Sequence, residues 1–186
     1  MNYESTCAGC SRSQGLDTVV GGIAKLSGDW VVNQYTGSEG FLGWLALQPR
    51  FHRRSLSDLT ESETTTLGPN IQALDRVLTR YWLHQFPADR VERVYIVYMF
   101  ESEFIDPLPK EQFHFHIHLI PRTEAFAQPG RLRFTKGGTT WNDGWHMPRM
   151  GEHGMIPEPY QLQPNNRLAR ATSLMDYVRH ELAARP

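Results

Sequence analysis

The stretch Phe113-His114-Phe115-His116-Ile117-His118-Leu119-Ile120 decides how this sequence is interpreted, because histidines alternate with large apolar residues along it. In a β-strand, successive side chains point to opposite faces of the sheet. The three histidines are therefore predicted to share one face, with about 6.6 Å between neighbouring imidazoles. The other face carries aromatic and aliphatic side chains and is predicted to be buried.

Three histidines on one strand face indicate chemistry more than packing. Imidazole titrates near neutral pH, so His114, His116 and His118 can together supply a nucleophile, an acid and a metal ligand. Two alternatives stay open at this point. A half-buried strand can carry histidines on its solvent face without a function, and two or three of them can serve only to bind a metal ion.

Apolar patterning outside this stretch predicts further strands and two helices. Short apolar runs bounded by Gly or Pro predict strands at 30–32, 42–47 and 94–99, the second ending at Gln48-Pro49 because proline cannot donate to a sheet ladder. The run 113–120 is the fourth predicted strand. A second amphipathic helix is predicted over 168–182, near the end of the chain.

The first helix has a clear predicted start. Thr60-Glu61-Ser62-Glu63 is a capping-box pattern, and an apolar stripe follows it at helical spacing. Gly68-Pro69 lies inside this segment and predicts a kink or a restart. Strands that can pair in sequence, together with this capped amphipathic helix, predict an α+β domain with a mostly antiparallel sheet.

The chain has 186 residues, which suits one compact domain with a peripheral extension. We expect a domain over 1–125, with 126–186 forming a C-terminal arm and helix packed on it. Residues 127–166 are rich in Gly, Pro, Asn and Trp without periodicity, which predicts a long ordered loop or arm.

Composition limits the partners and the compartment. The formal net charge is -1, so no basic field is available to bind a long nucleic acid. The N-terminal residues lack the apolar segment of a signal peptide, and no apolar run approaches the roughly 20 residues that span a bilayer. A cytoplasmic protein with no membrane partner is therefore expected, and two cysteines do not make a disulfide framework.

Cys7-Ala8-Gly9-Cys10 matches half of a structural zinc site, and a redox pair or two unrelated thiols are the alternatives. A redox motif normally lies between a strand and a helix, whereas no strand is predicted before Cys7. Zinc is therefore favoured, with two more ligands expected from histidines. Pro49-Arg50-Phe51-His52 places one histidine between a predicted strand and the capped helix.

Together these motifs resemble the histidine triad (HIT) family. His114 to Ile120 matches the family's His-φ-His-φ-His-φ-φ motif, where φ is an apolar residue. Leu45 to His52 is similar to the family's strand ending in proline, a basic residue and histidine, and Ser55 to Thr60 is similar to its link into the helix. The resemblance covers about Cys7 to Thr123.

The resemblance implies a HIT-like fold and a reaction at the phosphorus of a small nucleotide, in a protein that commonly forms homodimers. His116 would attack the α-phosphorus to form a nucleotidyl-histidine, and His118 would protonate or hydrogen-bond the leaving group. A structural zinc ion would be held by Cys7, Cys10, His52 and His114. The related sugar-phosphate uridylyltransferases have glutamine in place of His118, so a third histidine favours hydrolase-like branches.

Two predicted substrate contacts depart from the family pattern. Pro109-Lys110-Glu111 replaces a Gly-Gln-Ser or Gly-Gln-Thr segment, so Lys110 would contact phosphate in its place and Glu111 would oppose it. Thr36 falls near the family's acidic ribose-binding residue. Residues 128–166, with cationic and Trp side chains, are expected to cover the nucleotide site or to form a dimer interface.

The favoured function is a nucleotidyl hydrolase that cleaves a phosphoanhydride or phosphoramidate bond, as in dinucleoside polyphosphates and nucleoside phosphoramidates. A nucleotidyl transferase or phosphorylase of the same fold is the first alternative. A non-catalytic nucleotide-binding module, favoured by Glu111, is the second. A metallohydrolase with catalytic zinc on the triad is the third, and it would leave Cys7 and Cys10 without a role.

Overall fold

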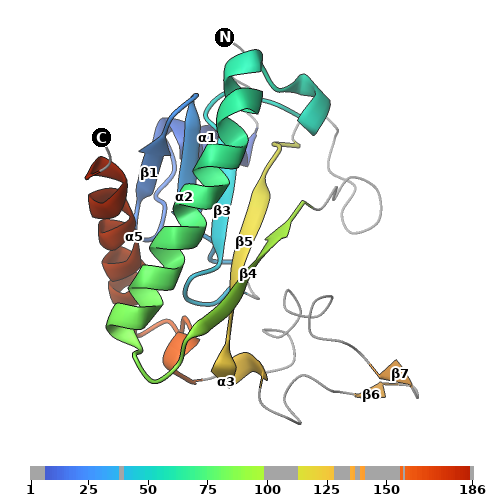
Figure 1. Ribbon diagram of the computed structural model, residues 1–186. Coiled ribbons are helices and arrows are strands. Elements are labelled where there is room, and N and C mark those ends of the chain that lie inside the picture. The colour runs from blue at the N-terminus through green and yellow to red at the C-terminus, as the bar shows by residue number, and fades with distance from the viewer. Residues whose placement is uncertain are drawn as a thin grey trace.

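A five-stranded antiparallel sheet forms the centre of the computed structural model, which describes residues 7–37, 40–98, 113–127, 135–136, 139–140, 156 and 158–184 (Figure 1). The strand order is β1-β2-β3-β5-β4, and every neighbouring pair is antiparallel. The predicted α+β class with a mostly antiparallel sheet is confirmed. The strands are β1 (Ile23–Leu26), β2 (Trp30–Gln34), β3 (Leu45–Pro49), β4 (Val91–Val97) and β5 (Ile117–Thr123).

The longest helix, α2 (Glu61–Gln85), begins as the capping box predicts. The hydroxyl of Thr60 accepts from the backbone N–H of Glu63 at 3.2 Å, and the Glu63 carboxylate accepts from the Thr60 N–H at 2.7 Å. The helix continues through Pro69, so the predicted restart at Gly68-Pro69 is wrong. An interior proline costs about 3 kcal/mol, and the residues that α2 buries after Pro69 outweigh this cost: Asn70, Ala73, Leu74, Val77, Leu78, Tyr81 and Trp82.

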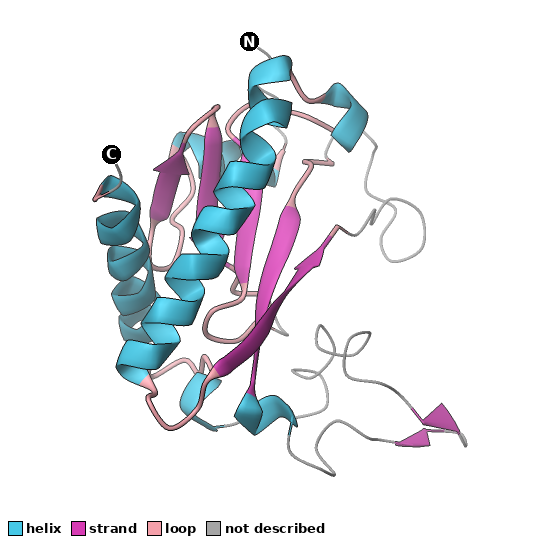
Figure 2. Cartoon of the chain, viewed as in Figure 1, coloured by secondary structure: helices cyan, strands magenta, loops and turns pink. Residues whose placement is uncertain are grey.

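The two long helices lie side by side on one face of the sheet (Figures 1 and 2). α2 packs over β4 and β5, while α5 (Arg167–Ala183) packs over β1 and β2. The C-terminal helix predicted over 168–182 is therefore present. Its Leu174, Met175 and Val178 belong to the same hydrophobic core as the sheet and α2.

The structure also contains elements that the sequence did not predict. β1 forms a hairpin with β2 through a loop in which Gly28 and Asp29 both have positive φ. Near the N-terminus, α1 (Ala8–Gln14) has no apolar stripe and ends at Gly15, whose φ of 74° is the left-handed conformation that glycine favours. The shorter elements are η1 (Leu56–Asp58), α3 (Glu124–Ala127), β6 (Thr135–Lys136), β7 (Thr139–Thr140) and η4 (Glu158–Tyr160).

The observed starts of β3 and β5 differ from the predicted ones. β3 ends at Pro49, which pairs with Trp30, in agreement with the predicted end at Gln48-Pro49, but it begins at Leu45 and not at Leu42. β5 begins only at Ile117, opposite Leu47, although the run from Phe113 was predicted to be strand. Pro49 has no N–H to donate, and its carbonyl oxygen accepts a hydrogen bond from the side chain of His114, which precedes β5.

Two expectations concern regions that the structure describes only in part. Most of the predicted arm over 127–166 lies outside the described residues. Within the described ranges, no helix has both the length and the apolar character needed to cross a membrane.

Candidate functional site

Four predicted metal ligands from distant parts of the chain meet at one point. Cys7 and Cys10 flank the start of α1, His52 follows β3, and His114 precedes β5. The distances are 3.4 Å from Cys7 Sγ to His114 Nδ1, 3.4 Å from Cys10 Sγ to His52 Nδ1, and 3.6 Å from Cys10 Sγ to His114 Nδ1. All four ligand atoms lie within 4.8 Å of one another, so the cluster could hold a metal ion.

The ring of His114 is oriented for this cluster by β3. Its Nε2–H donates to the backbone oxygen of Pro49 at 2.8 Å, which leaves the lone pair on Nδ1, the atom next to both sulfurs. Burial lowers the pKa of His114 to about 4, while the bond to Pro49 opposes this shift. The ring is therefore neutral, which is the form that binds metals.

Helix α1 is fixed to the end of β3 by side chains that donate to the backbone. The buried amide of Gln48 donates to the oxygen of Gly9 at 2.9 Å. The hydroxyl of Ser13 lies 2.8 Å from the oxygen of Arg50 and 3.0 Å from that of Cys10. These contacts bring both cysteines to His52 and His114 without a long element of regular structure.

Gly9 allows α1 to approach His114 closely. A Cβ atom at Gly9 would lie 2.4 Å from Cγ and 2.5 Å from Cβ of His114, closer than real Cβ atoms come to such neighbours. The atoms that it would meet belong to the base of the ring, so they cannot rotate away. Glycine between the two cysteines is therefore required by contact with His114.

Gly9→Ala is expected to lower the free energy of unfolding by about 1–3 kcal/mol, because the added methyl group overpacks the contact with His114. Gly68→Ala is the matched control, since no atom outside the neighbouring residues lies within 4 Å of a Cβ at that helix position. Chemical denaturation of both variants measures the effect. Equal stabilities for the two variants would contradict the steric role of Gly9.

His116 has a defined tautomer. Its Nδ1–H donates to the backbone oxygen of His114 at 2.9 Å, because a carbonyl oxygen can only accept. In the neutral ring the lone pair is then on Nε2, the nitrogen suited to attack an electrophile. The side chain is half-buried, and its ring lies 4.7 Å from that of His118, centroid to centroid, at 84°.

His118 is enclosed by aromatic rings. Its side chain is buried, and the indole N–H of Trp44 donates to its Nδ1 at 2.8 Å. The Tyr35 and Trp44 rings lie 5.2 and 5.4 Å away in edge-on arrangements. Burial, followed by the neighbouring charge of His116, lowers the pKa of His118 to about 3, so the ring is neutral at physiological pH.

Acid is expected to reduce stability through His118. Its pKa is about 3 in the folded protein and about 6.5 in an unfolded chain, so between these values only the unfolded state takes up this proton. The stabilising contribution is complete above pH 6.5 and decreases by roughly 1.4 kcal/mol per unit as the pH falls towards 3. Denaturation between pH 4 and 7 should therefore show a steeper loss for the natural protein than for His118→Gln. Parallel curves would contradict the assignment.

Of the two residues predicted to contact substrate, Thr36 is described by the structure and Lys110 is not. Thr36 is half-buried, and its backbone oxygen accepts from the guanidinium of Arg167, while Tyr35 beside it makes the contact with His118. Lys110 and Glu111 lie outside the described residues. Sequence patterns did not indicate four further residues, because their contacts are with partners far away in the chain: Gly9, Tyr35, Trp44 and Gln48.

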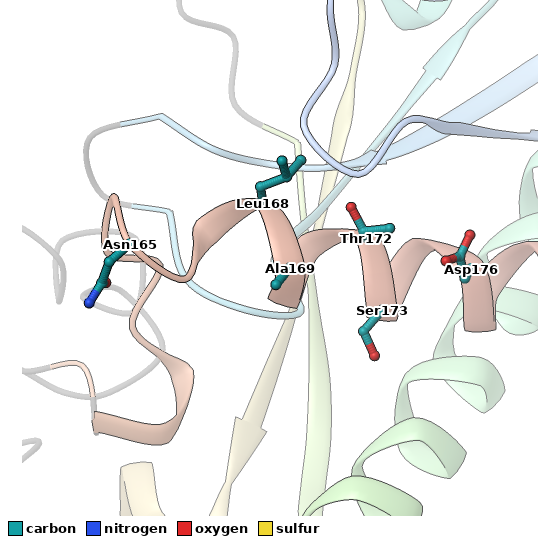
Figure 3. Close-up of a pocket in the computed structure, with 6 residues that line it drawn as sticks. All are labelled: Asn165, Leu168, Ala169, Thr172, Ser173 and Asp176. Atoms are coloured by element: carbon teal, nitrogen blue, oxygen red, sulfur yellow. The ribbon is translucent and has the colours of Figure 1, made fainter.

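A separate surface hollow lies on α5 and on Asn165, two residues before the helix begins (Figure 3). It shares no residue with the metal cluster or with the histidines. It is lined by Asn165, Leu168, Ala169, Thr172, Ser173 and Asp176.

We also compared the chain with known proteins. Models of protein families, curated proteins and solved structures give no match to it in any of the three comparisons.

Proposed function

We propose that this protein is a HIT-like nucleotidyl hydrolase that cleaves a phosphoanhydride or phosphoramidate bond of a small nucleotide through a nucleotidyl-His116 intermediate. The observation that carries the proposal is the hydrogen bond from His116 Nδ1–H to the His114 oxygen. In the neutral ring this bond puts the lone pair on Nε2, the nitrogen that would attack phosphorus.

The reaction then has two displacements. Nε2 of His116 forms a bond to the α-phosphorus, and the bond from phosphorus to the leaving group breaks. The adduct carries a positive charge, which the His114 oxygen stabilises through the retained Nδ1–H. Water next breaks the nitrogen–phosphorus bond, gives its proton to the solvent and restores neutral His116.

We propose that the metal is a structural zinc ion. Tetrahedral zinc with sulfur at about 2.3 Å and nitrogen at about 2.0–2.1 Å gives a sulfur–nitrogen edge of about 3.5 Å. The measured edges of 3.4, 3.4 and 3.6 Å fit this geometry. Two cysteines and two histidines complete the coordination and leave no position for water, so zinc would stabilise the fold there.

The cluster is linked to His116 through the backbone. His114 supplies its ring to the metal cluster and its carbonyl oxygen to His116. A metal ion that fixes His114 would therefore also fix the tautomer of His116. In this way a structural metal would affect catalysis.

A catalytic zinc ion on the three histidines is less well supported. Nε2 of His114 is hydrogen-bonded to the Pro49 oxygen and its Nδ1 faces the cysteines, while Nδ1 of His118 accepts a hydrogen bond from Trp44.

A phosphorylase differs from a hydrolase only in the molecule that releases the nucleotide from His116, which is phosphate instead of water. Purified protein should be assayed against nucleotide conjugates with and without inorganic phosphate: phosphate-dependent products would favour a phosphorylase, and no turnover of any conjugate would favour a non-catalytic nucleotide-binding module.

We further propose a homodimer formed through β4. This strand is an edge of the sheet, and its Ile96 side chain is 51% exposed. A second copy pairing with β4 would cover backbone groups and apolar surface together.

Ile96→Lys is expected to shift the protein towards the monomer, because it introduces a charge into the interface. Leu83→Lys is the matched control, since Leu83 is 58% exposed on α2. Light scattering after size-exclusion chromatography measures the masses. A natural protein that is monomeric, or a dimer unaffected by Ile96→Lys, would exclude this interface.

A further inference from the structure

The contact between Trp44 and His118 determines which nitrogen of His118 carries the proton. An indole N–H can donate a hydrogen bond but cannot accept one. Nδ1 of His118, 2.8 Å from Nε1 of Trp44, must therefore be the acceptor. The proton of the neutral ring is then on Nε2.

The surroundings keep His118 in this form. Protonation of Nδ1 would place two N–H groups against each other at 2.8 Å, inside a site where the ring is only 2% exposed. Among the described residues, the rings in contact with His118 are the indole of Trp44, the phenol of Tyr35 and the imidazole of His116, and none of these three is an anion that would favour a charged ring. Burial lowers the pKa of His118 in the same direction.

We propose that Trp44 is a positioning residue that fixes His118 as a neutral Nε2–H donor, and that the preferred substrates are therefore nucleotides with phosphoanhydride bonds and not phosphoramidates. This inference rests on the proposed attack by His116. Trp44, which directly precedes β3, would thereby determine which of the two classes of leaving group is preferred.

The proton balance explains the substrate class. When Nε2 of His116 bonds to phosphorus, the electron pair of the broken bond passes to the leaving group. A neutral His118 can stabilise that charge with a hydrogen bond, but transfer of its only proton would leave an imidazolate. A leaving phosphate is a stable anion and needs no proton, whereas an alkylamine must gain one, and His118 does not supply it.

The tautomer is tested directly by nitrogen NMR of protein labelled with ¹⁵N-histidine. In the natural protein, His118 should show one protonated nitrogen and one with a lone pair, unchanged from pH 5 to pH 9. Trp44→Phe should mix the tautomers. Trp30→Phe is the control, because it also removes a buried indole hydrogen bond, from Trp30 to the Glu63 oxygen at 3.1 Å. Two protonated nitrogens at neutral pH, or the same spectrum in Trp44→Phe, would overturn the role of Trp44.

The substrate class is tested with two probes, diadenosine tetraphosphate and the n-propylamine phosphoramidate of adenosine 5′-monophosphate. Because general acid catalysis contributes about a hundredfold or more, kcat/KM should favour the tetraphosphate by at least about a hundredfold. Trp44→Phe should lower kcat for the tetraphosphate by about tenfold with little change in KM, and Trp30→Phe should not. Equal kcat/KM values for the two probes would overturn the substrate assignment while His116 could remain the nucleophile. Normal turnover in His116→Ala would instead reject the proposed function, and the NMR result would still decide the tautomer.

Discussion

Replacement of His116 by alanine is expected to lower turnover of a nucleotide conjugate by at least about a thousandfold. The change removes the proposed nucleophile. In neutral His116 this is the lone pair on Nε2, because Nδ1–H donates to the His114 oxygen. The metal content and the thermal midpoint should stay close to those of the natural protein, because His116 is half-buried and is not one of the four clustered ligands. His84→Ala is the control, since His84 is exposed in the last turn of α2.

The stereochemistry at phosphorus provides an independent measurement. Two successive in-line displacements retain the configuration, whereas a single attack by water inverts it. A chiral α-phosphorothioate substrate should therefore give a product of retained configuration, and acid-free rapid quenching should trap the adduct on His116. Inversion, or normal turnover by His116→Ala, would reject the nucleotidyl-histidine mechanism.

The second large effect is expected at the cysteines. Cys7→Ser and Cys10→Ser should each lose bound zinc and lower the thermal midpoint by about 10 °C or more, because the free energy of binding a structural metal is also free energy of folding. Each change removes a sulfur ligand, and the remaining three ligands would not complete the proposed tetrahedral site. Metal analysis and thermal unfolding of the same preparations measure both effects.

Ala8→Ser is the matched control for these variants. It places the same serine side chain between the two cysteines, at an exposed position of α1, and keeps all four ligands. A strong chelator should lower the midpoint of the natural protein and of Ala8→Ser, but not that of the cysteine variants. Absence of zinc from the natural protein, together with unchanged midpoints in both cysteine variants, would exclude a structural zinc site.

Local patterns in the sequence predicted the parts of this protein that depend on near neighbours. The Thr60 capping box involves residues three positions apart, so its two hydrogen bonds follow from local chemistry. The clustering of two cysteines with His52 and His114 was also predicted, because a Cys-x-x-Cys zinc site needs two partners, and the chain offers these histidines at positions that resemble a known arrangement.

Only the tertiary structure decided the contacts that orient the rings of His114 and His118. Trp44 and His118 are 74 residues apart, and Pro49 and His114 are 65 apart. No periodicity in the sequence specifies such pairs, because they depend on how β3 and β5 align and on where β5 begins. Packing against the sheet similarly carried α2 through Pro69, against its local preference. The sequence alone therefore identified three histidines as candidates for chemistry, and contacts with distant residues decided which nitrogen bears the proton in the neutral rings of His114 and His118.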